Sequence, residues 1–135
     1  MSLKAINRIA DSISVQRLVE SVQYDPQNGV FIWRQRPADH FSRPDKAAKW
    51  NGKYAGNPAF TSADPRGYLR GMLDRRMLYA HRAAVAIQQG AWPDGEIDHI
   101  NRCKSDNRAE NLRVVSHREN RLNTADCDRT RGAAR

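Results

Sequence analysis

The stretch Ile97-Asp98-His99-Ile100 places an aspartate and a histidine side by side at the end of a short apolar run. Two asparagines follow further along the chain, Asn111 and Asn120. An imidazole can accept a proton, and carboxylate and amide oxygens can bind a metal ion. The four side chains can act together only if the fold brings them to one place, so this requirement is the first guide to the architecture.

Residues 96–124 predict a frame that meets this requirement. The run that ends at His99 indicates a strand, a polar loop follows, and Leu112-Arg113-Val114-Val115-Ser116 indicates a second strand. The serine that ends this run and a glutamate three positions later form a capping box, which predicts a helix carrying Asn120. Neighbours in a regular strand face opposite sides, so a strand end or a bulge must turn Asp98 and its neighbour toward one pocket.

Upstream, the patterns of apolar residues predict further elements of an α+β fold. The turn expected at Asp74-Arg75 lacks the glycine that a two-residue primed turn prefers, so a longer loop stays open. The expected elements are a helix over 12–23 capped by Ser12 or Ser14, a strand over 30–33, loops with one short helix over 38–65, a hairpin over 67–80 and a helix over 81–89.

Composition favours a small basic domain. The chain has 135 residues, of which 39% are hydrophobic, and a formal net charge of +8. That length suits one compact domain with a modest core, and the positive charge is typical of a partner rich in phosphate. No apolar run is long enough to suggest a membrane span, and no secretory segment opens the chain, which predicts a cytoplasmic protein. Two distant cysteines disfavour both a disulfide framework and a four-cysteine zinc site.

The residue types around Asp98 and His99 indicate hydrolysis of a phosphodiester. That reaction needs a group that takes a proton from water near neutral pH, and positive charge where negative charge accumulates on the phosphate. An imidazole, with its reference pKa of about 6.5, suits the first need. The oxygens of Asp98 and Asn120 suit Mg²⁺, and Asn111 can bond the imidazole ring and set its tautomer.

A set of short stretches strengthens this hypothesis, because their combined spacing is specific although each alone is weak. In chain order they are Tyr24-Asp25-Pro26, Gly29-Val30-Phe31, Trp33-Arg34, Tyr54-Ala55-Gly56, Gly67-Tyr68, Ala80-His81-Arg82, residues 95–101, residues 105–116 and Glu119-Asn120. The set spans residues 24–124 and resembles the HNH endonuclease family, in the branch common in bacteriophages and near homing endonucleases.

The resemblance implies a ββα-metal (His-Me finger) nuclease core that cuts DNA with one divalent ion and leaves 5′-phosphate and 3′-hydroxyl ends. Carried over by position, Asp98 and Asn120 would hold the metal, His99 would be the general base, and Asn111 would orient that base. Many relatives carry histidine where this chain has Asn120, so Mg²⁺ or Mn²⁺ is expected rather than Zn²⁺ or Ni²⁺. Many relatives also carry glycine near Arg102.

The resemblance also divides the chain and suggests its partner. Residues 1–66 would be an N-terminal region with possible DNA contacts, 67–124 the nuclease domain with its ββα-metal motif at 96–124, and 125–135 a disordered basic tail. Double-stranded DNA is the expected partner, with the protein acting as a monomer or a homodimer, in the host cytoplasm if a phage encodes it. The arginines expected to contact DNA are Arg82, Arg102, Arg108, Arg113, Arg118 and Arg121.

Two assignments stay open. His81, at the start of the helix over 81–89, is as well placed to pack or cap as to contact a phosphate. The whole protein could also be a DNA-binding module without catalytic activity, which would use its basic surface and lay the hairpin over 67–80 in a groove. Binding of DNA without nicking would favour that alternative.

Overall fold

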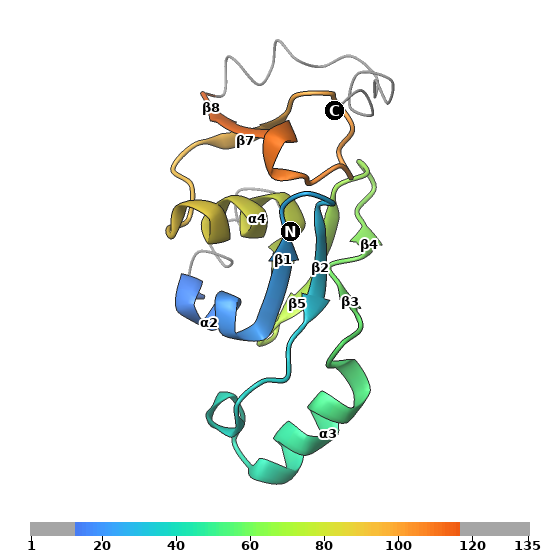
Figure 1. The fold of residues 1–135 in the computed structure, drawn as a ribbon, viewed down its shortest axis with the longest axis vertical. Helices are drawn as coiled ribbons and strands as arrows, with labels where there is room; N and C mark the ends of the chain where they lie inside the picture. The colour runs from blue at the N-terminus through green and yellow to red at the C-terminus, as the bar shows by residue number, and fades with distance from the viewer. Residues whose placement is uncertain (1–12, 117–135) are drawn as a thin grey trace.

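The computed structural model describes residues 13–116 of the chain (Figure 1). The expected capping-box helix, Asn120, Arg118, Arg121 and the tail over 125–135 lie outside these residues. The helices are α2 (Val15–Ser21), η1 (Ala38–His40), α3 (Pro44–Tyr54), α4 (Ala80–Gln89) and η2 (Ala109–Asn111). The strands are β1 (Val22–Asp25), β2 (Val30–Trp33), β3 (Pro58–Ala59), β4 (Ser62–Ala63), β5 (Leu69–Leu73), β6 (Arg76–Tyr79), β7 (Glu96–His99) and β8 (Leu112–Val115).

The strands form three small antiparallel sheets, ordered β1-β2-β3, β4-β5-β6 and β7-β8. Helix α4 lies between the β7-β8 pair at one end of the molecule and helix α2, with β1 and β2 beside it (Figure 1). Helix α3 forms the opposite end (Figure 1). The mixed α/β composition predicted from the sequence is confirmed, whereas the helix needed to complete a ββα unit after β8 falls outside the described residues.

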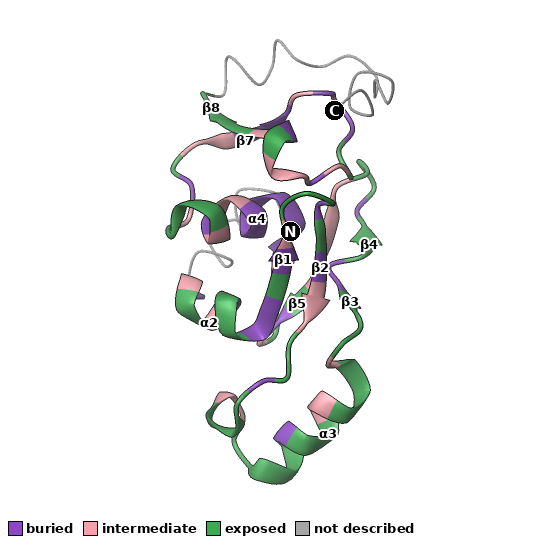
Figure 2. Ribbon diagram, in the orientation of Figure 1, coloured by how far each residue is buried: buried purple, intermediate pink, exposed green. Residues whose placement is uncertain are grey.

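One hydrophobic core joins the segments on both sides of the expected boundary at residues 66 and 67. Its buried side chains come from α2, β1, β2 and β3 as well as from β5, β6 and α4. The buried colouring is plainest on β1 and α4 (Figure 2). Leu18 and Leu78 are fully buried in it, and Phe60 packs edge-on against Phe31. The N-terminal segment thus stabilises the same core as the segment that carries Asp98.

The helix expected over 12–23 is shorter than predicted. It begins after Ser14, whose hydroxyl accepts a hydrogen bond from the backbone N–H of Arg17, and it ends at Ser21. Val22 instead opens β1, where it pairs with Trp33. The apolar residues at helical spacing did not reveal this end, because β-branched residues suit a strand once a partner strand is present.

Residues 38–65, expected to be mostly loop, contain an eleven-residue helix, α3. Pro44 occupies its first turn, where a missing N–H costs nothing, and Asp45 and Lys53 have charges that suit the helix dipole at either end. The signal for this helix in the sequence was weak because α3 fully buries only Ala47. Most of its surface therefore faces solvent, and polar residues outnumber apolar ones along it.

The hairpin over 67–80 is confirmed, and its turn has only two residues. Leu73 pairs with Arg76, so Asp74 and Arg75 form the whole loop, with φ of 51° and 65°. These angles are those of a primed turn, which glycine usually makes. The Asp74 carboxylate binds Arg36 at 2.7 Å and Arg17 at 3.3 Å, and these ion pairs help to hold the strained turn.

Candidate active site

Strand β7 carries Asp98 and His99 at its end, and β8 pairs with it so that Asp98 lies opposite Arg113 and His99 opposite Leu112. Both side chains are buried: Asp98 is 2% exposed and His99 is 5% exposed. They have partners on different elements, because neighbours in a strand point to opposite faces. The Asp98 carboxylate faces Arg113 on β8, and the His99 ring faces the loop that follows β7.

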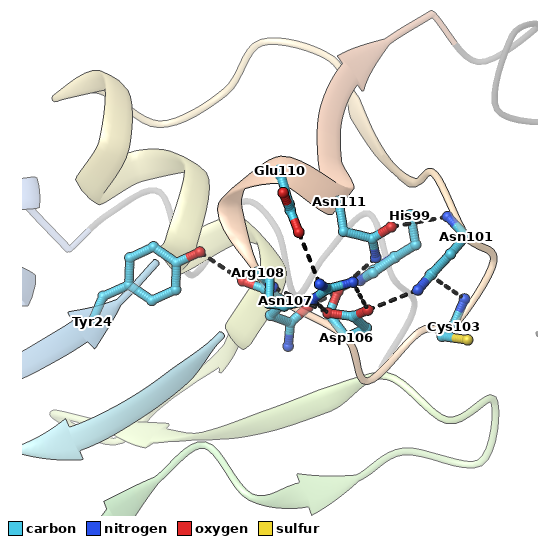
Figure 3. Close-up of polar contacts among 9 residues, drawn as sticks. All are labelled: Tyr24, His99, Asn101, Cys103, Asp106, Asn107, Arg108, Glu110 and Asn111. Carbon is cyan, nitrogen blue, oxygen red and sulfur yellow. Dashed lines mark hydrogen bonds and ion pairs between the residues drawn. The ribbon is translucent and has the colours of Figure 1, made fainter. Parts of the chain in front are cut away.

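The loop over 100–111 is held by amide side chains (Figure 3). The Asn111 side chain accepts a hydrogen bond from the backbone N–H of Asn101 at 2.9 Å and donates one to the Asp106 carbonyl at 2.8 Å. The Asn101 amide in turn donates to the Asp106 carboxylate at 2.7 Å. Since Asn111 is completely buried, these bonds close the loop without competition from water.

The histidine ring contacts Asn107, whereas the sequence had suggested Asn111. Nε2 of His99 lies 2.9 Å from the Oδ1 oxygen of Asn107 (Figure 3). A carbonyl oxygen only accepts hydrogen bonds, so Nε2 carries the proton and Nδ1 keeps the lone pair. Asn111 acts on the backbone of the loop rather than on the ring. Asn107 was not predicted as the partner of the ring, because nothing local in the sequence distinguishes a loop asparagine that reaches back to a strand.

Arg102 adopts a left-handed conformation in this loop, with φ of 65°. The resemblance had placed glycine near this position in many relatives. Glycine adopts this conformation at little cost, whereas arginine pays for it. The backbone N–H of Arg102 donates to the His99 carbonyl at 2.8 Å, which fixes the tight turn directly after the histidine.

Aromatic rings surround His99 on the side of helix α4. The His81 ring lies 5.3 Å from it in an edge-on arrangement, and the Tyr68 ring lies 5.9 Å away. Burial, followed by the nearness of His99 and Arg82, holds the pKa of His81 well below its ordinary value, so His81 is neutral. Its Nδ1 atom is buried and has no hydrogen-bond partner within residues 13–116. His81 therefore packs beside the site.

Burial also lowers the pKa of His99, against the opposing effects of the hydrogen bond to Asn107 and the negative charges of Asp98 and Asp106. The lowered pKa means that the ring is neutral at pH 7. A neutral imidazole with its proton on one nitrogen can accept a second proton on the other. The geometry and the charge state of His99 thus both suit a general base.

The four described arginines expected to contact DNA occupy different environments. Arg82 is buried on α4 and donates to the Pro93 carbonyl at 3.4 Å. Arg108 binds the Asp106 carboxylate through two nitrogens and Glu110 through a third, which leaves its charge balanced by carboxylates. Arg113 is half exposed and pairs with Asp98, while Arg102 is partly buried in the loop.

Asp98 is a candidate metal ligand among the described residues. No group of three His, Cys, Asp or Glu side chains able to hold an ion occurs within residues 13–116. Asp98 offers the hard oxygen ligand that Mg²⁺ and Mn²⁺ prefer. Mg²⁺ usually keeps several waters and needs only one or two protein carboxylates, so the donor chemistry of this site fits such an ion.

Comparison with known proteins finds a family match and a structural likeness. Residues 78–122 match the profile of the HNH endonuclease family, so the resemblance to that family is confirmed for the segment that contains α4, β7, η2 and β8. Among solved structures, the fold is similar to the one titled "DNA binding and cleavage by the HNH homing endonuclease I-HmuI", with a TM-score of 0.53 and 19% sequence identity.

The structural likeness covers 90% of this chain and 64% of the other chain, so this protein spans under two thirds of the length of its structural neighbour. At that identity the likeness establishes the fold. No curated protein sequence matches this chain closely enough to count as a relative. Within residues 13–116, no helix is long and apolar enough to cross a membrane.

Proposed function

We propose that this protein is a divalent-metal-dependent DNA endonuclease in which His99 is the general base. One observation carries the proposal: the His99 ring is fixed through Nε2 by Asn107, next to the buried carboxylate of Asp98, in a segment that matches the HNH endonuclease family. A fixed tautomer beside a metal-binding carboxylate is what activation of a water molecule needs.

The His99 ring accepts a proton from water through Nδ1 in this mechanism. The hydrogen bond to the Asn107 oxygen strengthens as the ring gains charge, because a cationic donor bonds a carbonyl more tightly than a neutral one. The nearby negative charge of Asp98 also favours the protonated ring. The ring is 5% exposed, so the mechanism requires that DNA binding admit water to Nδ1.

Asp98 and, from the segment beyond residue 116, Asn120 are the proposed ligands of a Mg²⁺ or Mn²⁺ ion. When bound, the ion stabilises negative charge on the phosphate and on the departing 3′ oxygen, which leaves 5′-phosphate and 3′-hydroxyl ends. Asn111 supports the site indirectly, since its amide closes the loop that carries Asn107.

A row of lysines on α3 is the proposed contact with the DNA backbone away from the site. Lys46, Lys49 and Lys53 are exposed at i, i+3 and i+7 spacing, which aligns them along one side of the helix. Within the described part of the chain, none of the three forms an ion pair. Helix α3 and the β7-β8 pair lie at opposite ends of the molecule (Figure 1). In a duplex that reaches both, the lysines would therefore contact the DNA backbone well to one side of the bond that is cleaved.

Cleavage of supercoiled plasmid tests the proposal. The protein is incubated with plasmid in Mg²⁺, in Mn²⁺ and in EDTA, beside His99→Ala, and DNA binding of both proteins is measured in parallel at low salt. We expect nicked or linear products only with metal, a loss of cleavage of at least about a hundredfold in His99→Ala, and equal DNA affinity. End mapping should find 5′-phosphates.

The same experiment separates the alternative function. A protein that binds DNA with no cleavage in any divalent metal would be a DNA-binding module, and equal cleavage by His99→Ala would remove His99 from its role. The lysine row is compatible with both functions, the endonuclease and the DNA-binding module, because it concerns DNA binding and not cleavage.

A further inference from the structure

The turn between β1 and β2 lies against the loop that carries Asn107 (Figure 1). The Tyr24 hydroxyl donates a hydrogen bond of 2.6 Å to the backbone oxygen of Asn107, which lies 83 positions further along the chain (Figure 3). The backbone N–H of Ala109 donates to the Pro26 carbonyl at 2.9 Å. Two hydrogen bonds therefore join the N-terminal hairpin to both sides of residue 108.

The contact is close enough to require glycine on one side. Gly29 has φ of 71°, and a Cβ atom built there would lie 2.4 Å from the backbone nitrogen of Arg108 and 2.6 Å from the carbonyl carbon of Asn107. Both clashes are with backbone atoms, which cannot rotate away as a side chain can. The hairpin turn and the loop are thus packed backbone against backbone.

Asn107 connects this contact to the site. Its backbone oxygen accepts from Tyr24, and its side-chain oxygen bonds the His99 ring at 2.9 Å. Asn107 is 1% exposed, so neither bond has water as a ready substitute. A shift of the backbone at residue 107 would move the amide relative to the imidazole and weaken the hydrogen bond that holds the proton on Nε2.

We propose that Tyr24 is a positioning residue for His99: the phenol holds the backbone of Asn107, and the Asn107 amide holds the imidazole with its proton on Nε2. The catalytic consequence rests on the proposed function, whereas the effect on the ring does not. The N-terminal hairpin then has a role inside the site as well as in the core.

The Tyr24 side chain is suited to this task. Burial, and then the negative charges of Asp25 and Asp106, raise the pKa of Tyr24 to about 12, so the hydroxyl keeps its proton throughout the working pH range. The ring also packs against Phe31, with centroids 4.9 Å apart. Tyr24→Phe keeps this ring packing and removes only the hydroxyl, which makes it a clean test.

The first experiment compares steady-state cleavage by Tyr24→Phe and Tyr79→Phe. Tyr79 is a matched control, because its hydroxyl also donates a buried hydrogen bond, at 2.9 Å to Asp64. We expect kcat of Tyr24→Phe to fall about tenfold or more with KM for DNA unchanged, since small displacements of a catalytic group cost rate rather than binding. Equal losses of kcat in the two variants would overturn the proposal.

The second experiment reads the ring directly and does not depend on cleavage. Long-range ¹⁵N–¹H spectra of the histidines, assigned with His99→Gln, should show His99 of the wild-type protein with its proton on Nε2. Tyr24→Phe should shift the His99 signals toward a mixture of tautomers, as Asn107→Ala should, while Tyr79→Phe should not. His99 signals identical in Tyr24→Phe and wild type would contradict the proposal. If Tyr24→Phe shifts the tautomer but the wild-type protein does not cleave DNA, the positioning role of Tyr24 is supported and only the proposed hydrolysis is rejected.

A glycine pair tests the same contact from the other side. Gly29→Ala meets both the strained φ and the clash with residues 107 and 108, whereas Gly90→Ala meets a strained φ of 79° in open space. We expect Gly29→Ala to alter the His99 signals and Gly90→Ala to leave them unchanged. The same His99 spectrum in both variants would count against the coupling of turn and ring.

Discussion

The carboxylate of Asp98 lies 2.9 Å from Nε of Arg113, the residue directly opposite it across the β7-β8 pair. The one carboxylate of the proposed metal site is therefore in contact with a fixed positive charge. Because Arg113 is half exposed, it can move away from Asp98 into solvent or toward a DNA phosphate. A divalent ion that binds Asp98 must displace or tolerate this guanidinium.

Arg113→Gln should therefore strengthen metal binding. Removing a cation beside the buried carboxylate favours another cation there, because Arg113 no longer competes for the carboxylate oxygens. Calorimetric titration of Mn²⁺ into the protein without DNA measures the effect directly. Weaker Mn²⁺ binding by the variant would show that Arg113 helps to shape the site instead of competing with the ion.

Asn111→Ala should destabilise the protein by about 1–3 kcal/mol, because it leaves the buried N–H of Asn101 and the carbonyl of Asp106 without their partner. Urea unfolding measures the change. Asn57→Ala is a matched control, since the Asn57 amide also donates to a backbone carbonyl but is exposed to water. Similar losses in both variants would mean that the loop over 100–111 is not held by Asn111.

Asp64 should make the stability fall at low pH. Burial alone would raise the pKa of Asp64, but hydrogen bonds from the Tyr68 N–H, the Tyr79 hydroxyl and the Arg66 N–H outweigh it, and the pKa is lowered. A carboxyl with a lowered pKa in the folded state stabilises the protein above its unfolded pKa, and that stabilisation is lost as the pH falls below about 4.

Unfolding by urea between pH 7 and pH 3 tests this dependence. The wild-type protein should lose stability below about pH 4, and Asp64→Asn, less stable at pH 7, should lose less over the same range. Parallel curves for the two proteins would show that other carboxyl groups cause the acid sensitivity.

Neutralising the lysine row on α3 should weaken DNA binding without changing catalysis. In Lys46→Gln/Lys49→Gln/Lys53→Gln we expect the slope of log affinity against log salt to become shallower by about 2–3, since each neutralised phosphate contributes about 0.9. The rate of cleavage at saturating DNA should stay the same. Filter binding across a range of salt concentrations measures the slope.

Arg75→Gln/Arg76→Gln is the control, because it removes exposed charge from the β5-β6 turn instead. A larger loss of DNA affinity in this control than in the lysine variant would place the duplex on the β5-β6 hairpin. That outcome would contradict the assignment of the DNA contact to α3.

The sequence alone determined the elements whose signals are local. Strands β7 and β8, the hairpin β5-β6 and helix α4 follow from short apolar runs and turn residues, and all lie where the patterns predicted them within a residue or two. The resemblance of the segment around Asp98 and His99 to the HNH endonuclease family could also be predicted from the sequence, since the spacing of its motifs is specific. The roles assigned to His99, Asp98, Asn111 and Asn120 remain predictions for the experiments above.

Only the tertiary structure decided which side chains meet. It placed Asn107 on the His99 ring and Asn111 on the loop backbone, and it brought Tyr24 to Asn107 from 83 positions away. It also buried Arg82, which the sequence presented as a surface charge. The reason is physical: periodicity and turn chemistry report on neighbours along the chain, whereas a hydrogen bond between buried polar groups depends on how separate elements pack.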